Sequence, residues 1–188
     1  MRLVEQVERP VAKTQGTHGK GTKEPKALAC YGLDLHLRGE GGSVERRVWL
    51  RFVDGRPVSE ITCRYLAWCC EKLGGLGKEA LLLVWDNAGC HTSAAVREWI
   101  GTHNRRVRWS GKGVRILLCL LPKKSPWLNP IEPKWVHSRR KIVEPDWLLS
   151  AAELEGRVYD CFGCDHQDRP PSHNRPLDYA LVHSQRGS

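Results

Sequence analysis

Apolar positions recur along this chain with two different periods, and the two periods predict strands and helices. Runs of continuous or alternating apolar residues are typical of strands, whereas apolar residues three and four positions apart are typical of amphipathic helices. Strands are predicted at 27–34, 44–54, 80–85 and 114–121, and helices at 59–73, 94–102, 131–141 and 148–162. A glycine-rich turn separates the first two strands, so we expect them to form an antiparallel hairpin.

Residues that cap or break helices stand at the ends of the predicted helices. Ser59 and Ser93 have side chains suited to a helix N-cap, a Gly-Gly pair ends the first helix, and Pro130 favours a helix start just after it. The strand at 80–85 is almost continuously apolar, which is typical of a strand covered on both faces. A hairpin followed by alternating helices and strands indicates an α/β fold, with a mixed sheet flanked by helices.

The two ends of the chain lack such periodicity. Residues 1–26 are polar and rich in Gly, Thr and Lys, so they predict a disordered or extended lead. Residues 165–188 contain three prolines and few apolar residues, so we expect a loosely ordered tail. One domain is therefore expected at 27–164. The sequence contains neither a transmembrane-length apolar run nor a signal-peptide pattern, which predicts a cytoplasmic protein with no membrane contact.

Composition changes this picture mainly through charge. A net charge of +9 and a pI near 9.3 indicate a polyanionic partner, of which nucleic acid is the commonest, although a merely basic soluble protein is the simpler alternative. Most of the eight cysteines lie in apolar segments, where a free thiol behaves as a small hydrophobic group. Cys161 and Cys164 with His166 nearby make at most half of a structural zinc site, because no second ligand pair follows at zinc-binding spacing.

Two blocks carry the candidate chemistry, and each places an acid just past an apolar run. The first is LLLVWDNAGCH at 81–91, with Asp86 after the strand, and the second is LLPKKSPWLNPIEPKW at 120–135, with Glu132 after Pro130. Ligands of α/β sheets bind beyond the carboxyl ends of the strands, and two carboxylates there can share hard divalent cations. Taken singly, Asp86 is equally an ordinary turn residue, and Glu132 an ordinary first-turn helix acid.

Together these blocks resemble the catalytic domain of DDE transposases, in the mariner-like branch that includes many bacterial insertion sequences. The resemblance lies in Val84-Trp85-Asp86-Asn87 with His91, and in the run from Leu121-Pro122 through Ser125-Pro126-Trp127-Leu128-Asn129-Pro130-Ile131-Glu132. It implies a ribonuclease H-like fold and DNA transposition by metal-dependent strand cleavage and strand transfer. The implied cofactor is Mg²⁺ or Mn²⁺, and the implied partners are transposon ends and target DNA. A nucleoid-associated protein of the bacterial cytoplasm is expected. Whether it forms a homodimer is left open.

The resemblance assigns Asp86 and Glu132 as the second and third acids of a catalytic, metal-binding triad. Asn87 is expected to bond Asp86 or DNA or to make the turn, and His91 to contact a phosphate, order the metal shell or serve the structure alone. Asn129 is expected to open the helix of Glu132. For Trp127 a core position is favoured over stacking on a base. DNA phosphate contacts, or else a solvated face, are expected from Arg105, Arg106, Arg108, Lys112, Lys123, Lys124, Lys134, Arg139, Arg140 and Lys141.

The chain departs from the family at the first acid of the triad, an aspartate on the first strand. Residues 1–26 contain no Asp, and no strand is predicted there. We therefore expect the first strand to be missing and the chain to be the C-terminal part of a transposase, and another reading frame could supply the rest. Asp34 and Asp54 are the nearest substitutes for this aspartate, but neither matches the first acid by position.

Three interpretations stay open at this stage. The first is a transposase catalytic domain that takes its missing acid from elsewhere, and the second is a non-catalytic DNA-binding remnant. A ribonuclease H-like nuclease or resolvase is the third. Metal-dependent nicking separates the first and third from the second, and joining of a 3′ end to target DNA separates the first from the third.

Overall fold

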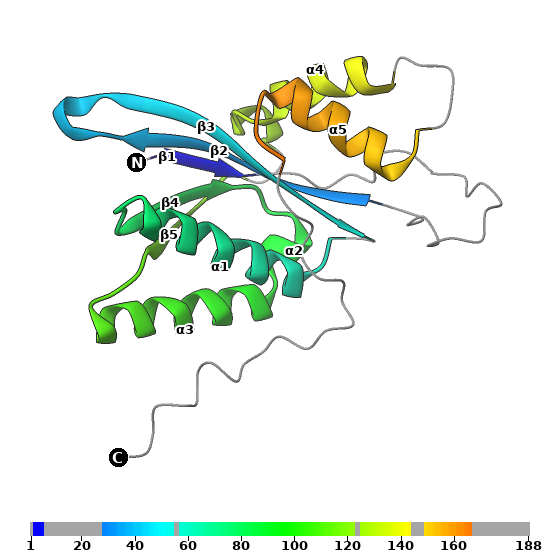
Figure 1. The fold of residues 1–188 in the computed structure, drawn as a ribbon. Helices are drawn as coiled ribbons and strands as arrows, with labels where there is room; N and C mark the ends of the chain where they lie inside the picture. The colour runs from blue at the N-terminus through cyan, green and yellow to red at the C-terminus, as the bar shows by residue number, and fades with distance from the viewer. Residues whose placement is uncertain (1, 6–27, 55–56, 123–124, 144–148, 167–188) are drawn as a thin grey trace.

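The described part of the chain folds into a five-stranded mixed sheet with helices on both faces (Figure 1). The computed structural model describes residues 2–5, 28–54, 57–122, 125–143 and 149–166. The strands are β1 (Arg2–Glu5), β2 (Leu28–Arg38), β3 (Val44–Asp54), β4 (Ala80–Trp85) and β5 (Arg115–Leu120). The helices are α1 (Ser59–Gly75), α2 (Gly89–Thr92), α3 (Ala94–Ser110), α4 (Glu132–Val143) and α5 (Ala151–Phe162), with 3-10 turns η1 (Glu40–Gly42) and η2 (Pro126–Leu128). The predicted α/β class is confirmed.

The strand order is β3-β2-β1-β4-β5. β2 runs antiparallel to both of its neighbours, and β4 runs parallel to both β1 and β5. The predicted hairpin is confirmed, with β2 and β3 paired from Leu28 opposite Asp54 to Arg38 opposite Val44. This mixed sheet is consistent with the ribonuclease H-like fold that the resemblance implies.

The prediction that the first strand is missing is wrong. β1 lies within the segment predicted to be a lead, and it occupies the centre of the sheet between β2 and β4. Its register places Val4 opposite Asp34 on one side and opposite Val84 on the other. Four residues are too few to show a period, so only pairing with distant strands identifies this strand. Residues 6–26 and the predicted tail from 167 onward lie outside the described residues.

Two hydrophobic cores hold the helices against the sheet. On one face, alternate residues of β2 and β4, among them Leu33 and Leu83, pack with α1 and α3. On the other face, residues of β2 and β3 such as Cys30 and Phe52 pack with α4 and α5. Figure 1 shows α1 and α3 on one side of the sheet and α4 and α5 on the other. Along β4, buried and half-buried residues alternate, so one face of this strand is fully covered and the other is covered in part.

Helix α3 extends to Ser110, beyond its predicted end at residue 102, so most of the basic stretch that follows residue 102 is helical. Ile100, His103 and Val107 are buried at helical spacing, so the helical period continues among the arginines. The Asn104 side chain also bonds both the backbone N–H and the carbonyl of Ile116 in β5. Ser93 caps the helix as predicted, by accepting from the Val96 N–H.

Other helix ends differ from their predictions in smaller ways. The N-cap of α1 is Val58 rather than Ser59, whose hydroxyl instead donates to that of Ser93 at 2.8 Å. Helix α5 begins with a capping box between Ser150 and Glu153. No helix in the described part of the chain is both long and apolar enough to cross a membrane.

Apolar side chains are exposed along β5 and after it. β5 is the last strand of the sheet order, and Leu117, Leu118 and Leu120 are all partly or largely exposed. Cys119 on the same strand is exposed as well, against the prediction for cysteines in apolar segments. The core position favoured for Trp127 is wrong, because that side chain is 72% exposed in η2.

Candidate active site at the end of strand β4

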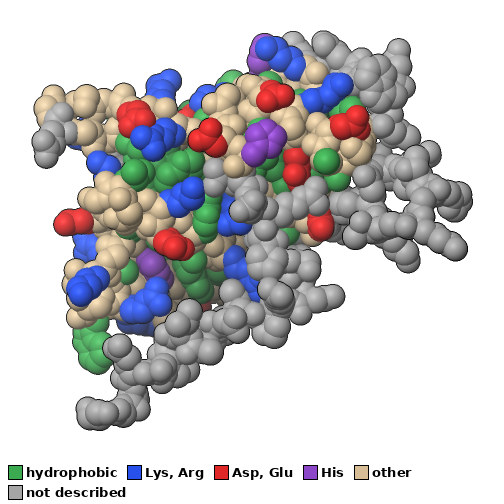
Figure 2. Space-filling model, in the orientation of Figure 1, with side chains coloured by type: hydrophobic (Ala, Val, Ile, Leu, Met, Phe, Trp, Pro, Cys, Tyr) green, Lys and Arg blue, Asp and Glu red, His purple; other side chains and the backbone are tan. Residues whose placement is uncertain are grey.

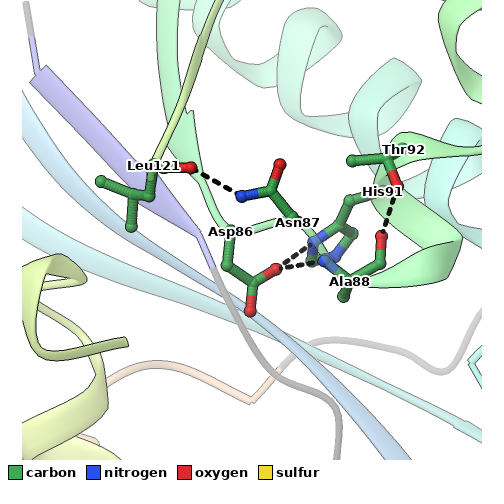
Figure 3. Close-up of polar contacts among 6 residues, drawn as sticks. All are labelled: Asp86, Asn87, Ala88, His91, Thr92 and Leu121. Carbon is green, nitrogen blue, oxygen red and sulfur yellow. Dashed lines mark hydrogen bonds and ion pairs between the residues drawn. The ribbon is translucent and has the colours of Figure 1, made fainter. Parts of the chain in front are cut away.

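Asp86 is the first residue past β4, and its carboxylate is held by the backbone and side chain that follow it (Figure 3). The Ala88 N–H donates to Asp86 Oδ1 at 2.9 Å, and His91 Nδ1 lies 3.0 Å from the same oxygen. An ionised carboxylate only accepts, so the ring nitrogen is the donor. The short helix α2 brings His91 back to Asp86, and the Thr92 hydroxyl donates to the Ala88 carbonyl at 3.1 Å.

The imidazole of His91 is fixed from a second direction. It stacks on the Trp85 ring, with centroids 4.6 Å apart and planes 5° from parallel. Both side chains are buried. Trp85, the last residue of β4, therefore orients His91, and His91 in turn orients Asp86. The imidazole has little freedom to leave the carboxylate.

The pKa of Asp86 reflects two opposing influences. Burial raises the pKa of this carboxyl, but the hydrogen bonds from His91 and Ala88 and the charge of His91 outweigh burial and lower it below its ordinary value. Asp86 is therefore ionised at neutral pH. Both hydrogen bonds fall on Oδ1 (Figure 3), which leaves Oδ2 as the oxygen that could coordinate a cation.

Asn87 joins the end of β4 to the end of β5. Its side-chain amide donates to the Leu121 carbonyl at 2.6 Å, and the Leu121 N–H donates to the Trp85 carbonyl at 2.9 Å. Of the roles considered for Asn87, the turn is closest to this arrangement, although the bond spans two strands. The first block is thereby tied to the beginning of the second.

Glu132 opens α4, at the end of the second block. Asn129 is fully buried before it, and its carbonyl accepts from the Glu132 N–H at 3.1 Å. The Asn129 side-chain oxygen also lies 3.5 Å from the Ile131 nitrogen, as expected of a residue that opens a helix. Glu132 is half-buried in the first helical turn, where the helix dipole favours a negative charge.

The donors described here fit part of a site for a hard cation. Asp86 offers an ionised carboxylate with one oxygen available, and such oxygens are the ligands that Mg²⁺ and Mn²⁺ prefer. Among the side chains that the structure describes, no three His, Cys, Asp or Glu residues gather closely enough to hold a metal ion. Asp86 is therefore the acid whose surroundings best suit a metal ligand.

The structure separates the basic residues into groups. Arg105, Arg106, Arg108 and Lys112 are exposed at the C-terminal end of α3 or just beyond it, and Figure 2 shows Lys and Arg side chains over this helix. Since α3 has 17 residues and leads away from α2, these cations lie on the order of 20 Å from Asp86. Arg139 and Lys141 are exposed on α4. Lys123, Lys124 and the side chain of Arg140 lie outside the described residues.

The two acids considered as substitutes for the first aspartate have other surroundings. Asp34 is buried in β2 and forms an ion pair with Lys134 of α4, with Oδ2 and Nζ 2.7 Å apart. Asp54 is the exposed last residue of β3, at the far edge of the sheet. Sequence reasoning missed this ion pair, because its partners are 100 positions apart. An aspartate within an otherwise apolar strand was the signal that could have indicated a buried partner.

Comparison with known proteins adds one match. A family model described as DDE superfamily endonuclease matches residues 46–150, which is more than half of the chain and includes both blocks. No curated protein matches the chain.

Proposed function

The chain belongs to the DDE superfamily endonuclease family, and on that premise we propose that it acts in DNA transposition, as a catalytic domain of the mariner-like insertion-sequence type. The reaction would be metal-dependent DNA strand cleavage followed by strand transfer. The observation that carries the proposal is the ionised carboxylate of Asp86 at the end of β4, oriented by His91 and the Ala88 N–H.

Asp86 and Glu132 are the proposed ligands of Mg²⁺ or Mn²⁺. When bound, such ions activate the attacking oxygen and stabilise the leaving oxygen of a phosphodiester. The protein's own part is to hold the ligands in place. His91 and the Ala88 N–H keep Asp86 ionised and fix one of its oxygens. Asn87 ties β4 to the chain that leads to Glu132.

The proposed DNA contacts lie on more than one surface. The exposed cations at the end of α3 would bind phosphates about six base pairs from the cut, since B-DNA rises roughly 3.4 Å per base pair along each strand. Arg139 and Lys141 on α4 would bind closer to Glu132. We leave Lys134 out of this set, because Asp34 already neutralises its charge.

A second candidate function is a DNA-binding remnant that keeps the fold but does not cut. The observation that favours it is that the described side chains gather no third acid with Asp86 and Glu132, the two proposed metal ligands. Both functions predict salt-sensitive DNA binding, because phosphate contacts release counterions.

Nicking of supercoiled plasmid in Mg²⁺ or Mn²⁺ tests the proposal. Wild-type protein should nick, and Asp86→Asn and Glu132→Gln should not. Glu98→Gln is the matched control, because this exposed acid on α3 is part of neither block; it should retain nicking. Joining of a 3′ end to target DNA would extend the result from nuclease to transposase. Salt-sensitive DNA binding without any nicking by the wild type would instead support the remnant.

A further inference from the structure

Two residues of β2, Gly32 and Asp34, lie beneath the start of α4, and the proposed reaction assigns neither of them a role. Successive side chains of a strand point to opposite faces of the sheet, so residues 28, 30, 32 and 34 share one face. Leu28 and Cys30 belong to the core formed with α4 and α5, so Gly32 and Asp34 lie on that face as well. The opposite face takes Tyr31, Leu33 and Leu35. The short Gly32-Leu33-Asp34 sequence therefore presents alternate residues to the helix that carries Glu132.

Gly32 provides the space that α4 occupies. A Cβ atom at this position would lie 3.0 Å from Trp135 Cζ2, 3.0 Å from Leu50 Cδ2 and 3.5 Å from Ile131 Cδ1. Trp135 lies in the first turn of α4, and Ile131 directly precedes this helix. The Trp135 N–H donates a hydrogen bond to the Ile131 carbonyl. Any side chain at position 32 would push this turn away from the sheet.

Asp34 provides the one charged anchor described between β2 and this turn. The residue is 2% exposed, and its Oδ2 lies 2.7 Å from Lys134 Nζ. The other oxygen, Oδ1, is buried and makes no hydrogen bond in the described part of the chain. His36 Nε2 is 4.0 Å from it, too far for a hydrogen bond. Lys134 is thus the described side chain that hydrogen-bonds this carboxylate, and it ties Asp34 to α4.

An ion pair fixes the position of a helix along and around its own axis, which apolar packing alone leaves free. A helix on an apolar surface can slide or rotate with little change in buried area, whereas a buried charge must meet its partner, so a polar pair can set register. Successive residues of a helix are about 100° apart around its axis. A rotation of α4 that released Lys134 would therefore also turn Glu132 away from its direction.

We propose that Gly32 and Asp34 form the seat of α4, and that Asp34 is a positioning residue for Glu132, acting through Lys134. The positioning role rests on the proposed function of Glu132 as a metal ligand. The seat itself does not, since it concerns only where the first turn of α4 is held. Asp34 is accordingly no substitute for the first acid of the triad, because its carboxylate is engaged by the helix.

The test combines amide hydrogen exchange with Mn²⁺ binding, measured on the full chain. Asp34→Asn and Lys134→Gln each remove one charge of the pair, and Lys134→Arg keeps it. The first two variants should speed exchange at the Trp135 and Val136 amides but not in α3. They should also weaken Mn²⁺ binding roughly 10- to 100-fold, as loss of groups that orient metal ligands does. Lys134→Arg should keep exchange at these amides and Mn²⁺ affinity close to those of the wild type.

Asn104→Ala is the matched control, because it removes two hydrogen bonds between α3 and β5 far from α4. It should speed exchange in α3 and β5 and leave α4 and Mn²⁺ affinity unchanged. Equal loosening of all helices in Asp34→Asn, or wild-type exchange in α4, would overturn the seat. Faster exchange with unchanged Mn²⁺ affinity would overturn the positioning role alone. Absence of Mn²⁺ binding by the wild type would count against the proposed function, and exchange would then decide the seat.

Discussion

Replacement of His91 by alanine removes the group that orients Asp86, and its cost can be worked from the contacts of the imidazole. A hydrogen bond to a charged group contributes about 1.5–3 kcal/mol, and the side chain of Asp86 is 32% exposed, which favours the lower end of that range. The stacked pair with Trp85 adds about 0.5–1.5 kcal/mol. We therefore expect His91→Ala to lower the free energy of unfolding by about 2–3 kcal/mol.

Urea unfolding at neutral pH measures this loss, and His91→Phe separates its two parts. Phenylalanine keeps a ring over Trp85 but cannot donate to Asp86, so it should recover the stacking contribution alone. An NMR titration of the Asp86 carboxyl gives the electrostatic part independently. Its pKa should rise in both variants, because burial, which raises it, remains after the hydrogen bond and charge of His91 are gone.

The pH dependence has a definite sign. A carboxyl whose pKa is lower in the folded state stabilises the protein above its unfolded pKa, and this contribution is lost as pH falls through the folded pKa. The difference between wild type and His91→Phe should therefore be full at pH 7 and shrink below about pH 4. A loss in His91→Ala of under about 0.5 kcal/mol, the range of ordinary surface substitutions, with an unchanged Asp86 pKa, would refute this account of the site.

Three further predictions concern other parts of the fold. Asn87→Ala should lower the free energy of unfolding by about 1–3 kcal/mol, because the Leu121 carbonyl loses its donor; urea unfolding and faster exchange at the end of β5 would check it. Burial lowers the pKa of His103, so the unfolded chain takes up the proton first, and stability should fall as pH drops below about 6.5; unfolding at pH 7 and pH 5 should show this fall in wild type and not in His103→Gln. Burial raises the pKa of the Cys70 thiol to about 12, so a thiol reagent should modify exposed Cys119 well before Cys70, whereas equal rates would contradict the packing of α1.

Local patterns were sufficient for the elements that carry the candidate site. The apolar run before Asp86 predicted β4 with its observed bounds, and Pro130 placed the start of α4 within a residue or two. The hairpin of β2 and β3 followed from two apolar segments around a glycine-rich turn. In each case the signal lies within the element or beside it, which is why sequence alone was adequate.

Features that depend on distant pairing were not visible in the sequence. β1 is a strand because two distant strands enclose it, and its four residues carry no period of their own. The last turns of α3 were not predicted as helix because three arginines stand among Ile100, His103 and Val107, the residues that face the fold. The pair of Asp34 and Lys134 joins positions far apart in the chain, so only the folded arrangement reveals it.

The exposed strand β5 has a consequence for how the protein behaves at high concentration. A terminal strand with leucines on both faces and no described neighbour on its outer side is a template for the addition of another strand. Natural proteins protect such edges with lysine or proline within the strand, and Arg-Ile-Leu-Leu-Cys-Leu has its charge only at the first position. In concentrated solutions the protein should therefore aggregate first through pairing at β5. Leu118→Lys should raise the highest protein concentration that stays in solution. It changes neither of the two blocks, at 81–91 and 120–135, that contain Asp86 and Glu132.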